Sequence, residues 1–215
     1  MNTRIDHLVI AAASLEQGAA YVKDRLGADM PFGGVHPKMG THNCLMRLGN
    51  DIFLEIISVN PDAVQPERPR WFALDDASVR QRIEKEPVLL AWVVNTPDIY
   101  KLMSGASFPM GIAEPVSRGN LNWFFSLPED GRLFGGGMLP YAIQWQTEPH
   151  PSGNMADNGC ELISLEIKHP CPEWLMSNLA SIGAEELVSV SRQAQGKPPE
   201  LTAVIKTPSG VIILK

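Results

Sequence analysis

The sequence predicts an α+β fold built from repeated βαβββ modules. Three observations support this prediction: a strand–helix–three-strand order covers residues 4–59, the same order returns over residues 88–147, and a similar order occupies residues 158–215. A repeat of this length is stronger evidence than any single element, because internal repeats define the architecture of the whole fold. Ordinary ferredoxin-like repeats are the alternative explanation, since they use the same kinds of elements.

The first module shows the pattern most clearly. Residues 4–12 (RIDHLVIAA) form an apolar run with β-branched residues, which is typical of a strand. Ser14 and Gln17 then have the spacing of a helix N-terminus, and Gly27 suits the end of that helix. The apolar residues that recur at helical spacing are Leu15, Ala19, Val22 and Leu26. Three further strands are expected at residues 28–36, 41–48 and 51–59.

The second and third units repeat this order. In the second module a strand over residues 88–96 precedes Pro97, which is tolerated in the first turn of a helix that reaches about residue 104. Its further strands are expected around residues 112–116, 120–127 and 139–147. The third unit is expected to hold a strand, a helix, a strand and a hairpin, at residues 161–168, 172–182, 185–191, 201–206 and 211–214. Residues 60–87 are expected to form a bridge anchored by Trp71 and Phe72.

Composition and charge argue against several classes of protein. The chain has 215 residues and a formal net charge of −6, and its Lys and Arg residues are scattered, so no nucleic-acid partner is expected. No stretch approaches the roughly 18 apolar residues of a membrane helix, and the N-terminus lacks the pattern of a signal peptide. The three cysteines have no CxxC spacing, which favours free thiols in a reducing compartment. We therefore expect a cytoplasmic protein with no membrane partner.

Polar residues that interrupt apolar strands are the candidates for a site. His7 lies within IDHLVI and Glu55 within IFLEII, and a carboxylate on an apolar strand is costly unless it has a partner or faces a wet cavity. His42 begins a neighbouring strand. Two histidines and a glutamate are ligand types that suit a divalent metal. The alternatives are that His7 is a core histidine with satisfied hydrogen bonds, and that His42 is a surface residue or a proton shuttle.

These segments resemble a known family. The stretch DHLVIAA, a helix that ends in LG, and the stretches GTHN and FLEII together resemble the glyoxalase-like domains of the vicinal oxygen chelate superfamily, which also includes bleomycin resistance proteins and extradiol dioxygenases. The resemblance is strongest over residues 4–59 and extends to residue 147. It implies that residues 1–147 form a cupped, barrel-like mixed sheet with helices outside. It also implies a divalent metal held by the first and last strands of each module, with His7 and Glu55 at the first-module positions and His42 at the histidine of the GTHN-type segment.

The second module departs from this ligand pattern. Ala91 or Trp92 stands where His7 stands in the first module, and Gln144 stands where Glu55 stands. A glutamine can ligate a metal through its carbonyl oxygen, but it is a poor general base. The expected metal ligands are His7, His42, Glu55 and Gln144, and Glu55 is also the expected catalytic residue. The expected substrate-binding residues are Asn43, Asn122 and Trp123.

Other conspicuous residues receive no role from the sequence. Cys44 is expected to lie in the core rather than to act as a nucleophile. His36 and His150 lie beside prolines, and no partner can be named for either. The Gly33-Gly34 pair is not followed by a helix, so it is not predicted to be a phosphate-binding loop. No G-x-S-x-G nucleophile motif occurs, which argues against a hydrolase of that type.

Two functions are compatible with these patterns. The first is a metal-dependent enzyme of the lyase, isomerase or dioxygenase type that acts on a small oxygenated organic substrate. In it, a metal such as Zn, Ni or Mn would act as a Lewis acid while Glu55 or a neighbouring group moves a proton, whereas Fe(II) would suit oxygen chemistry instead. The second is a non-catalytic protein of the same fold that binds and sequesters a small molecule, and a purely structural interaction module is a third alternative. A third unit without an internal partner also favours a homodimer.

Overall fold

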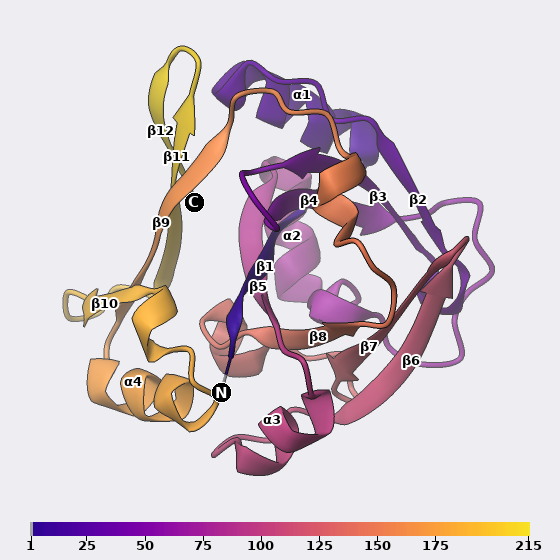
Figure 1. Cartoon of the computed structure of the whole chain (residues 1–215). Coiled ribbons are helices and arrows are strands. Elements are labelled where there is room, and N and C mark those ends of the chain that lie inside the picture. Colours follow the sequence, from indigo (N-terminus) through magenta and orange to yellow (C-terminus); the bar gives the residue numbers. More distant parts are fainter. Residues whose placement is uncertain (1) are drawn as a thin grey trace.

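The computed structural model describes residues 2–215 and contains two β-sheets with α-helices packed around them (Figure 1). The large sheet has the strand order β2-β3-β4-β1-β5-β8-β7-β6, and the small sheet has the order β10-β9-β11-β12. The strands of the large sheet are β1 (Arg4–Ala11), β2 (Phe32–His36), β3 (Thr41–Arg47), β4 (Phe53–Val59), β5 (Val88–Asn95), β6 (Ile112–Arg118), β7 (Leu121–Leu127) and β8 (Tyr141–Trp145). Those of the small sheet are β9 (Glu161–His169), β10 (Ser189–Arg192), β11 (Glu200–Thr207) and β12 (Gly210–Leu214).

The helices connect and cover these strands. The α-helices are α1 (Leu15–Leu26), α2 (Ala77–Lys85), α3 (Ile99–Gly105) and α4 (Pro172–Ser181). The short 3-10 helices are η1 (Pro37–Met39), η2 (Trp71–Ala73), η3 (Phe134–Gly137), η4 (Pro151–Asn154) and η5 (Glu185–Leu187). No helix in the described part of the chain is long and apolar enough to cross a membrane.

The large sheet consists of two modules with the same topology. In each module the first strand pairs in parallel with the last strand, as β1 does with β4 and β5 with β8, and the other neighbours are antiparallel. The two first strands, β1 and β5, pair antiparallel at the centre of the sheet. The sheet curls, so that its end strands β2 and β6 come into contact (Figure 1). The predicted α+β fold, with paired βαβββ modules in a cupped, barrel-like sheet, is therefore confirmed.

Local sequence sets the ends of α1 and its packing. The Ser14 hydroxyl accepts a hydrogen bond from the Gln17 backbone N–H (3.2 Å), and Gly27 ends the helix with a left-handed φ of 69°. The helix lies against β3 and β4. Gly18 allows this close approach, because a Cβ at that position would lie 2.4 Å from Ile56 Cγ2.

The second module differs from the prediction at the start of its helix and at the end of β6, and its strand β8 is shorter than expected. Its helix α3 begins at Ile99 rather than at Pro97. The reason is that the Asp98 carboxylate accepts a hydrogen bond from the Lys101 backbone N–H (3.0 Å) and so caps the helix one residue after the proline. The strand β6, expected only around residues 112–116, pairs with β7 along its whole length.

The third unit has the predicted order of elements but a different pairing. Strand β9 lies inside the small sheet, parallel to β10 and antiparallel to β11, whereas the first strand of each module lies at that module's edge. The reason is that α4 returns the chain beside β9, so that β9, α4 and β10 form a parallel crossover unit. Backbone hydrogen bonds from Leu162 to Leu48 and from Leu89 to Lys215 join this unit to the large sheet. The homodimer stays a prediction.

The bridge between the two modules packs into the cupped sheet. Its residues Trp71 and Phe72 are buried. The Phe72 ring lies 4.8 Å from the Tyr141 ring and 6.0 Å from the Phe125 ring, measured between centroids. The Trp71 ring lies 5.6 Å from that of Phe125. The two aromatic residues therefore anchor the bridge on the second module.

Candidate active site

The cupped sheet encloses a cavity of about 40 Å³ between the two modules. Its polar lining residues are His7, His36, Asn43, Glu55 and Arg118. Its aromatic lining residues are Phe53, Trp71, Phe72, Trp123, Phe125 and Trp145. Since a water molecule needs roughly 10–15 Å³ of such space, the cavity as it stands admits only a few water molecules or a very small organic group.

A β-bulge at the start of β1 places two polar side chains next to each other. The pairing of β1 with β5 shifts register between Ile5 and His7, so Asp6 is the extra residue in β1. A bulge re-aims the side chain of the extra residue, which regular alternation would have turned away from its neighbour. As a result the Asp6 carboxylate accepts a hydrogen bond from His7 Nδ1 at 2.6 Å.

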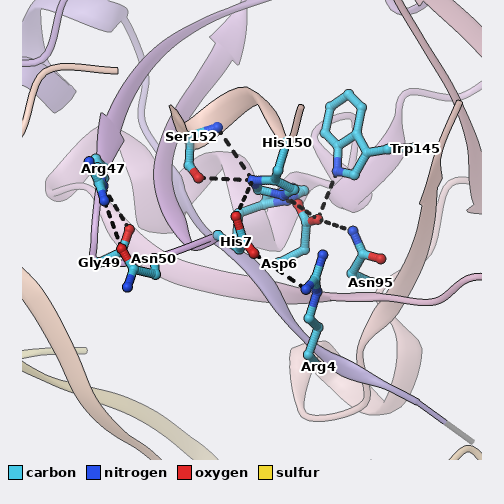
Figure 2. Close-up of polar contacts among 11 residues, drawn as sticks. Arg4, Asp6, His7, Arg47, Gly49, Asn50, Asn95, Trp145, His150 and Ser152 are labelled. Atoms are coloured by element: carbon cyan, nitrogen blue, oxygen red, sulfur yellow. Dashed lines mark hydrogen bonds and ion pairs between the residues drawn. The ribbon is translucent and has the colours of Figure 1, made fainter. Parts of the chain in front are cut away.

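The fully buried Asp6 carboxylate also accepts hydrogen bonds from residues that are distant in the sequence (Figure 2). Its Oδ2 atom accepts hydrogen bonds from Asn95 Nδ2 (2.8 Å), Trp145 Nε1 (2.8 Å) and His150 Nε2 (3.0 Å). Burial by itself would raise the pKa of Asp6, but the hydrogen bonds and charges of His150 and His7 outweigh burial and hold that pKa well below its ordinary value. Asp6 is therefore an anion that fixes the orientation of His7.

His7 and Glu55 converge in the cavity. The two residues come from the neighbouring parallel strands β1 and β4, and His7 Nε2 lies 3.7 Å from Glu55 Oε2. The imidazole ring also stacks on Phe53, with centroids 4.5 Å apart. Because Nδ1 is bound to Asp6, the other ring nitrogen is the one available to a ligand.

A chain of hydrogen bonds continues from Glu55 into the second module. Asn43 Nδ2 donates to Glu55 Oε1 (2.6 Å), and Arg118 Nη1 donates to Asn43 Oδ1 (3.0 Å) and lies 3.3 Å from His36 Nε2. Because a guanidinium only donates, His36 Nε2 is the acceptor, and His36 Nδ1 donates to Thr41 Oγ1 (3.1 Å). Burial and the neighbouring Arg118 charge lower the pKa of His36 to about 3, so this histidine is neutral.

The segment that joins β8 to β9, residues 146–160, closes part of the cavity, and we refer to it as the strap. Its residues Pro151 and Met155 line the cavity, and its helix η4 contacts β3. The strap is held in place by His150, whose Nδ1 accepts from the Ser152 backbone N–H (3.3 Å) while its Nε2 donates to Asp6. The same carboxylate therefore orients His7 and fixes the strap (Figure 2).

Of the predicted site residues, His7, Asn43, Glu55 and Trp123 line the cavity, whereas His42, Asn122 and Gln144 do not. The reason is strand alternation, since each of the three lies next to a residue that faces inward. Gln144 Oε1 accepts a hydrogen bond from the Ile99 backbone N–H (2.9 Å) at the start of α3. Asn122 is exposed, and His42 lies on the outer face of β3, where burial lowers its pKa and Glu16 and Asp62 oppose that shift. The roles of His42 and Gln144 as metal ligands, and of Asn122 in substrate binding, stay predictions, with the three side chains outside the cavity lining.

The donor set of the cavity is smaller than a divalent metal needs. Among residues 2–215 no group of three or more His, Cys, Asp or Glu side chains lies close enough together to hold a metal ion. His7 and Glu55 are two donors, but Ile143 and Trp145 face the cavity from β8, and Arg118 brings a positive charge to the same space. Zinc sites and the facial triads that hold Fe(II) use at least three protein ligands. The side chains present therefore do not fit a resident divalent metal.

Sequence reasoning missed several residues of this site. Asp6 precedes His7 directly, but regular alternation would have turned the two side chains to opposite faces. Arg118 and His36 come together only because β6 and β2 meet at the ends of the curled sheet. His150 was noticed without a partner, because its partner Asp6 lies 144 positions away in the sequence.

The fold and the cavity define a protein of the vicinal oxygen chelate class, with two βαβββ modules around one site. Residues 5–183 match the family model for the glyoxalase-like domain, and the chain belongs to that family. The resemblance inferred from the sequence is therefore confirmed. No curated protein matches the chain.

Solved structures show the same fold at low sequence identity. A hypothetical protein from Staphylococcus aureus is 14% identical, with a TM-score of 0.61 over 99% of this chain and 84% of that one. A variant of 4-hydroxymandelate synthase from Streptomyces coelicolor is 14% identical, with a TM-score of 0.52 over 98% of this chain and 62% of that one. A methylmalonyl-CoA epimerase from Mycobacterium tuberculosis is 17% identical, with a TM-score of 0.42 over 68% of this chain and 89% of that one. The TM-scores of the first two structures indicate a shared fold, and identities this low say nothing about the substrate.

Proposed function

We propose that this protein is an enzyme that moves a proton on a small oxygenated organic substrate, with Glu55 and His7 as its acid–base pair. One observation carries the proposal: His7 Nε2 and Glu55 Oε2 face each other across 3.7 Å in the cavity, while a buried carboxylate holds the other nitrogen of His7. An imidazole oriented by a carboxylate is a recurrent arrangement for proton transfer. Of the reaction types expected from the sequence, isomerase or lyase chemistry uses these groups directly.

The proposed reaction is proton transfer at a carbon next to a carbonyl group. Glu55 takes the proton from that carbon, and the electron pair of the C–H bond forms a C=C bond. His7, held by Asp6, donates the Nε2 proton to the carbonyl oxygen, which yields an enol. The reverse steps return both protons, so the reaction consumes no other reactant. The hydrogen bond to Asp6 holds the His7 ring in place throughout this cycle.

The walls of the cavity support such a step. Phe53, Trp123 and Trp145 surround the acid–base pair with apolar surface. Exclusion of water strengthens the electrostatic interactions of the reacting groups and protects an enol intermediate from side reactions. The strap lies over the same space, so its displacement is the expected route of entry for the substrate.

Deuterium exchange in D2O tests the proposal. Pyruvate, hydroxyacetone and other small 2-oxo acids and hydroxy ketones are incubated with the protein, and proton NMR follows the loss of the C–H signals next to the carbonyl group. We expect exchange to be faster than in buffer for at least one compound. The His7→Gln and Glu55→Gln variants should lower the rate about 100-fold, because acid–base groups contribute roughly that factor or more. The His42→Gln variant is the matched control, since this histidine lies on the outer face of β3.

A binding protein without turnover is the rival, and the small, largely aromatic cavity is the observation that favours it. Its signature is a compound that raises the melting temperature of the protein without exchanging its protons. If no compound in the series exchanges faster with the protein than without it, the enzymatic proposal fails.

Elemental analysis of protein purified without chelators tests the donor-set argument. We expect less than one equivalent of Zn, Ni, Mn or Fe, because two side-chain donors next to a guanidinium hold a divalent ion weakly. Stoichiometric metal that is lost in both the His7→Gln and the Glu55→Gln variant would contradict this expectation.

A further inference from the structure

We propose that the cavity holds its substrate by a carboxylate group, which Arg118 binds in a bidentate ion pair. The inference rests on the proposed function, because it names the chemical class of the substrate for the same cavity. Three features carry it: the path of Arg118 into the first module, the atoms that its guanidinium contacts, and the charges around it.

The Gly33-Gly34 pair makes the space in which Arg118 lies. Arg118 ends β6 in the second module, and its side chain crosses to β2 in the first module. A Cβ at position 34 would lie 2.8 Å from Arg118 Cδ and 3.2 Å from its Nε. A Cβ at position 33 would lie 2.5 Å from Asn43 Oδ1, the atom to which Arg118 donates. The close approach of Arg118 and Asn43 therefore explains why positions 33 and 34 are glycines, and no phosphate-binding loop is needed to explain them.

Part of the guanidinium is already used, and part of it is free for a ligand. Nη1 donates to Asn43 Oδ1 (3.0 Å) and to His36 Nε2 (3.3 Å). Within residues 2–215, Nε and Nη2 donate to no other side chain or carbonyl, and no acidic side chain forms an ion pair with Arg118. Asn43 lies between the guanidinium and Glu55, whose Oε1 it binds at 2.6 Å. A partly buried positive charge is thus left without a direct counter-ion.

These contacts favour a carboxylate over other ligands. The Nε and Nη2 atoms of an arginine present two parallel N–H groups, which match the two oxygens of a carboxylate. Arg118 is the one Arg or Lys among the described residues that line the cavity, and Glu55 brings a carboxyl group close by. A monoanion therefore suits the site better than a phosphate dianion, which a single guanidinium neutralises only in part.

The small size of the cavity restricts the length of the substrate. The Asn43 amide links Nη1 of Arg118 to Glu55 Oε1, so both the amide and the guanidinium separate a ligand carboxylate at Nε and Nη2 from the proposed base. Short carboxylic acids, such as 2-oxo acids, are the class of carboxylate that a cavity of about 40 Å³ favours by size.

Binding of three acids and their neutral amides tests the inference. The probes are acetate, pyruvate and lactate, each compared with acetamide, pyruvamide or lactamide, and the Kd is measured from the fluorescence of the cavity tryptophans. At least one carboxylate should bind the wild-type protein ten times more tightly than its amide. Arg118→Gln should remove that difference, Arg118→Lys should reduce it, and Arg132→Gln should leave it unchanged, because Arg132 is exposed and paired with Asp130.

Two kinds of outcome overturn the inference, and deuterium exchange separates them from a failure of the proposed function. If no acid binds more tightly than its amide, or if Arg118→Gln keeps the preference while its melting temperature shows that it is folded, Arg118 is not a carboxylate site. If methylphosphonate binds more tightly than acetate, the site is built for phosphate groups. Deuterium exchange that persists in these cases leaves the acid–base function intact. Carboxylate binding that depends on Arg118 without any exchange supports this inference and refutes the acid–base function.

Discussion

The two modules share one topology but line the cavity with different chemistry. The first module contributes four polar residues, His7, His36, Asn43 and Glu55, together with Leu45 and Phe53. Asn43 donates a hydrogen bond to Glu55, and His7 Nε2 lies 3.7 Å from Glu55 Oε2. The second module contributes aromatic and aliphatic walls, together with Arg118. The same strand order therefore serves two tasks: one module supplies the proposed reacting atoms, and the other shapes the space and supplies a charge.

The difference follows from what burial requires of each kind of side chain. Apolar residues such as Ile143 need only alternation to face inward, so the second module can present them without partners. Buried polar residues need hydrogen bonds, and those of the first module obtain some of them from the second. Asn95 and Trp145 donate to Asp6, and Arg118 donates to Asn43. The polar network of one module is thus completed by the other.

The largest loss of stability is expected at Asp6, where the hydrogen-bond network joins the two modules. We predict that Asp6→Asn lowers the free energy of unfolding by about 3–5 kcal/mol, because removing one partner of a buried charged network leaves the others unsatisfied. Urea unfolding at neutral pH measures the loss. The matched control is Asp29→Asn, which removes an exposed ion pair with Lys23 and should cost at most about 1 kcal/mol. Equal losses in the two variants would mean that Asp6 does not join the modules.

The sequence predicted those site residues whose position depends on the regular alternation of side chains along a strand. His7 and Glu55 were recognisable because each interrupts an apolar strand, and their strands pair in register. Asp6 was missed because a bulge breaks alternation at that position. Gln144 was assigned to the cavity because a one-residue error in aligning two strands exchanges the inner and outer faces.

The sequence could not predict the contacts between residues that come together only because the sheet curls. Arg118 and His36 belong to the two end strands of the sheet, and nothing in either strand indicates how far the sheet curls. The Gly33-Gly34 pair was the available signal, since adjacent glycines in a strand often mark the close approach of another group. A pair of glycines does not say which group approaches.

Trp145 offers a smaller test of how the second module supports the first. We predict that Trp145→Phe lowers the free energy of unfolding by about 2 kcal/mol, since it removes one hydrogen bond to the charged Asp6 and keeps an aromatic ring in the cavity wall. Thermal and urea unfolding measure this change. Trp123→Phe is the control, because Trp123 lines the same cavity and its ring lies 5.3 Å from that of Trp145. A similar loss in both variants would assign the effect to ring size instead of to the hydrogen bond.

The lowered pKa of His36 predicts how the free energy of unfolding changes with pH. The pKa of His36 is lowered to about 3 in the folded chain, from an ordinary value of 6.5. The unfolded chain therefore takes up a proton between these values while the folded chain does not, so stability falls as pH drops from 6.5 towards 3. We expect a slope of about 1 kcal/mol per pH unit from this residue, measured by urea unfolding between pH 7 and 4.5.

The His36→Gln variant should flatten that slope, because glutamine does not titrate and its carbonyl oxygen can still accept from Arg118. His42→Gln should flatten it less, since His42 is less buried and Glu16 and Asp62 counteract the lowering of its pKa. An unchanged slope in His36→Gln would mean that the contact between the end strands does not hold His36 neutral.

The smallest loss of stability is expected at Gln144. This residue tests most directly whether the reacting groups come from the first module alone. Gln144 accepts a hydrogen bond from the first N–H of α3, so Gln144→Ala should cost about 1 kcal/mol, as the loss of a helix cap does. Gln146→Ala, at an exposed position two residues further on, should cost less. Neither variant should change deuterium exchange, carboxylate affinity or metal content, whereas Glu55→Gln should lower the exchange rate about 100-fold. If Gln144→Ala reduced exchange as Glu55→Gln does, the second module would reach the reacting atoms after all, and the assignment of reaction to one module and walls to the other would be wrong.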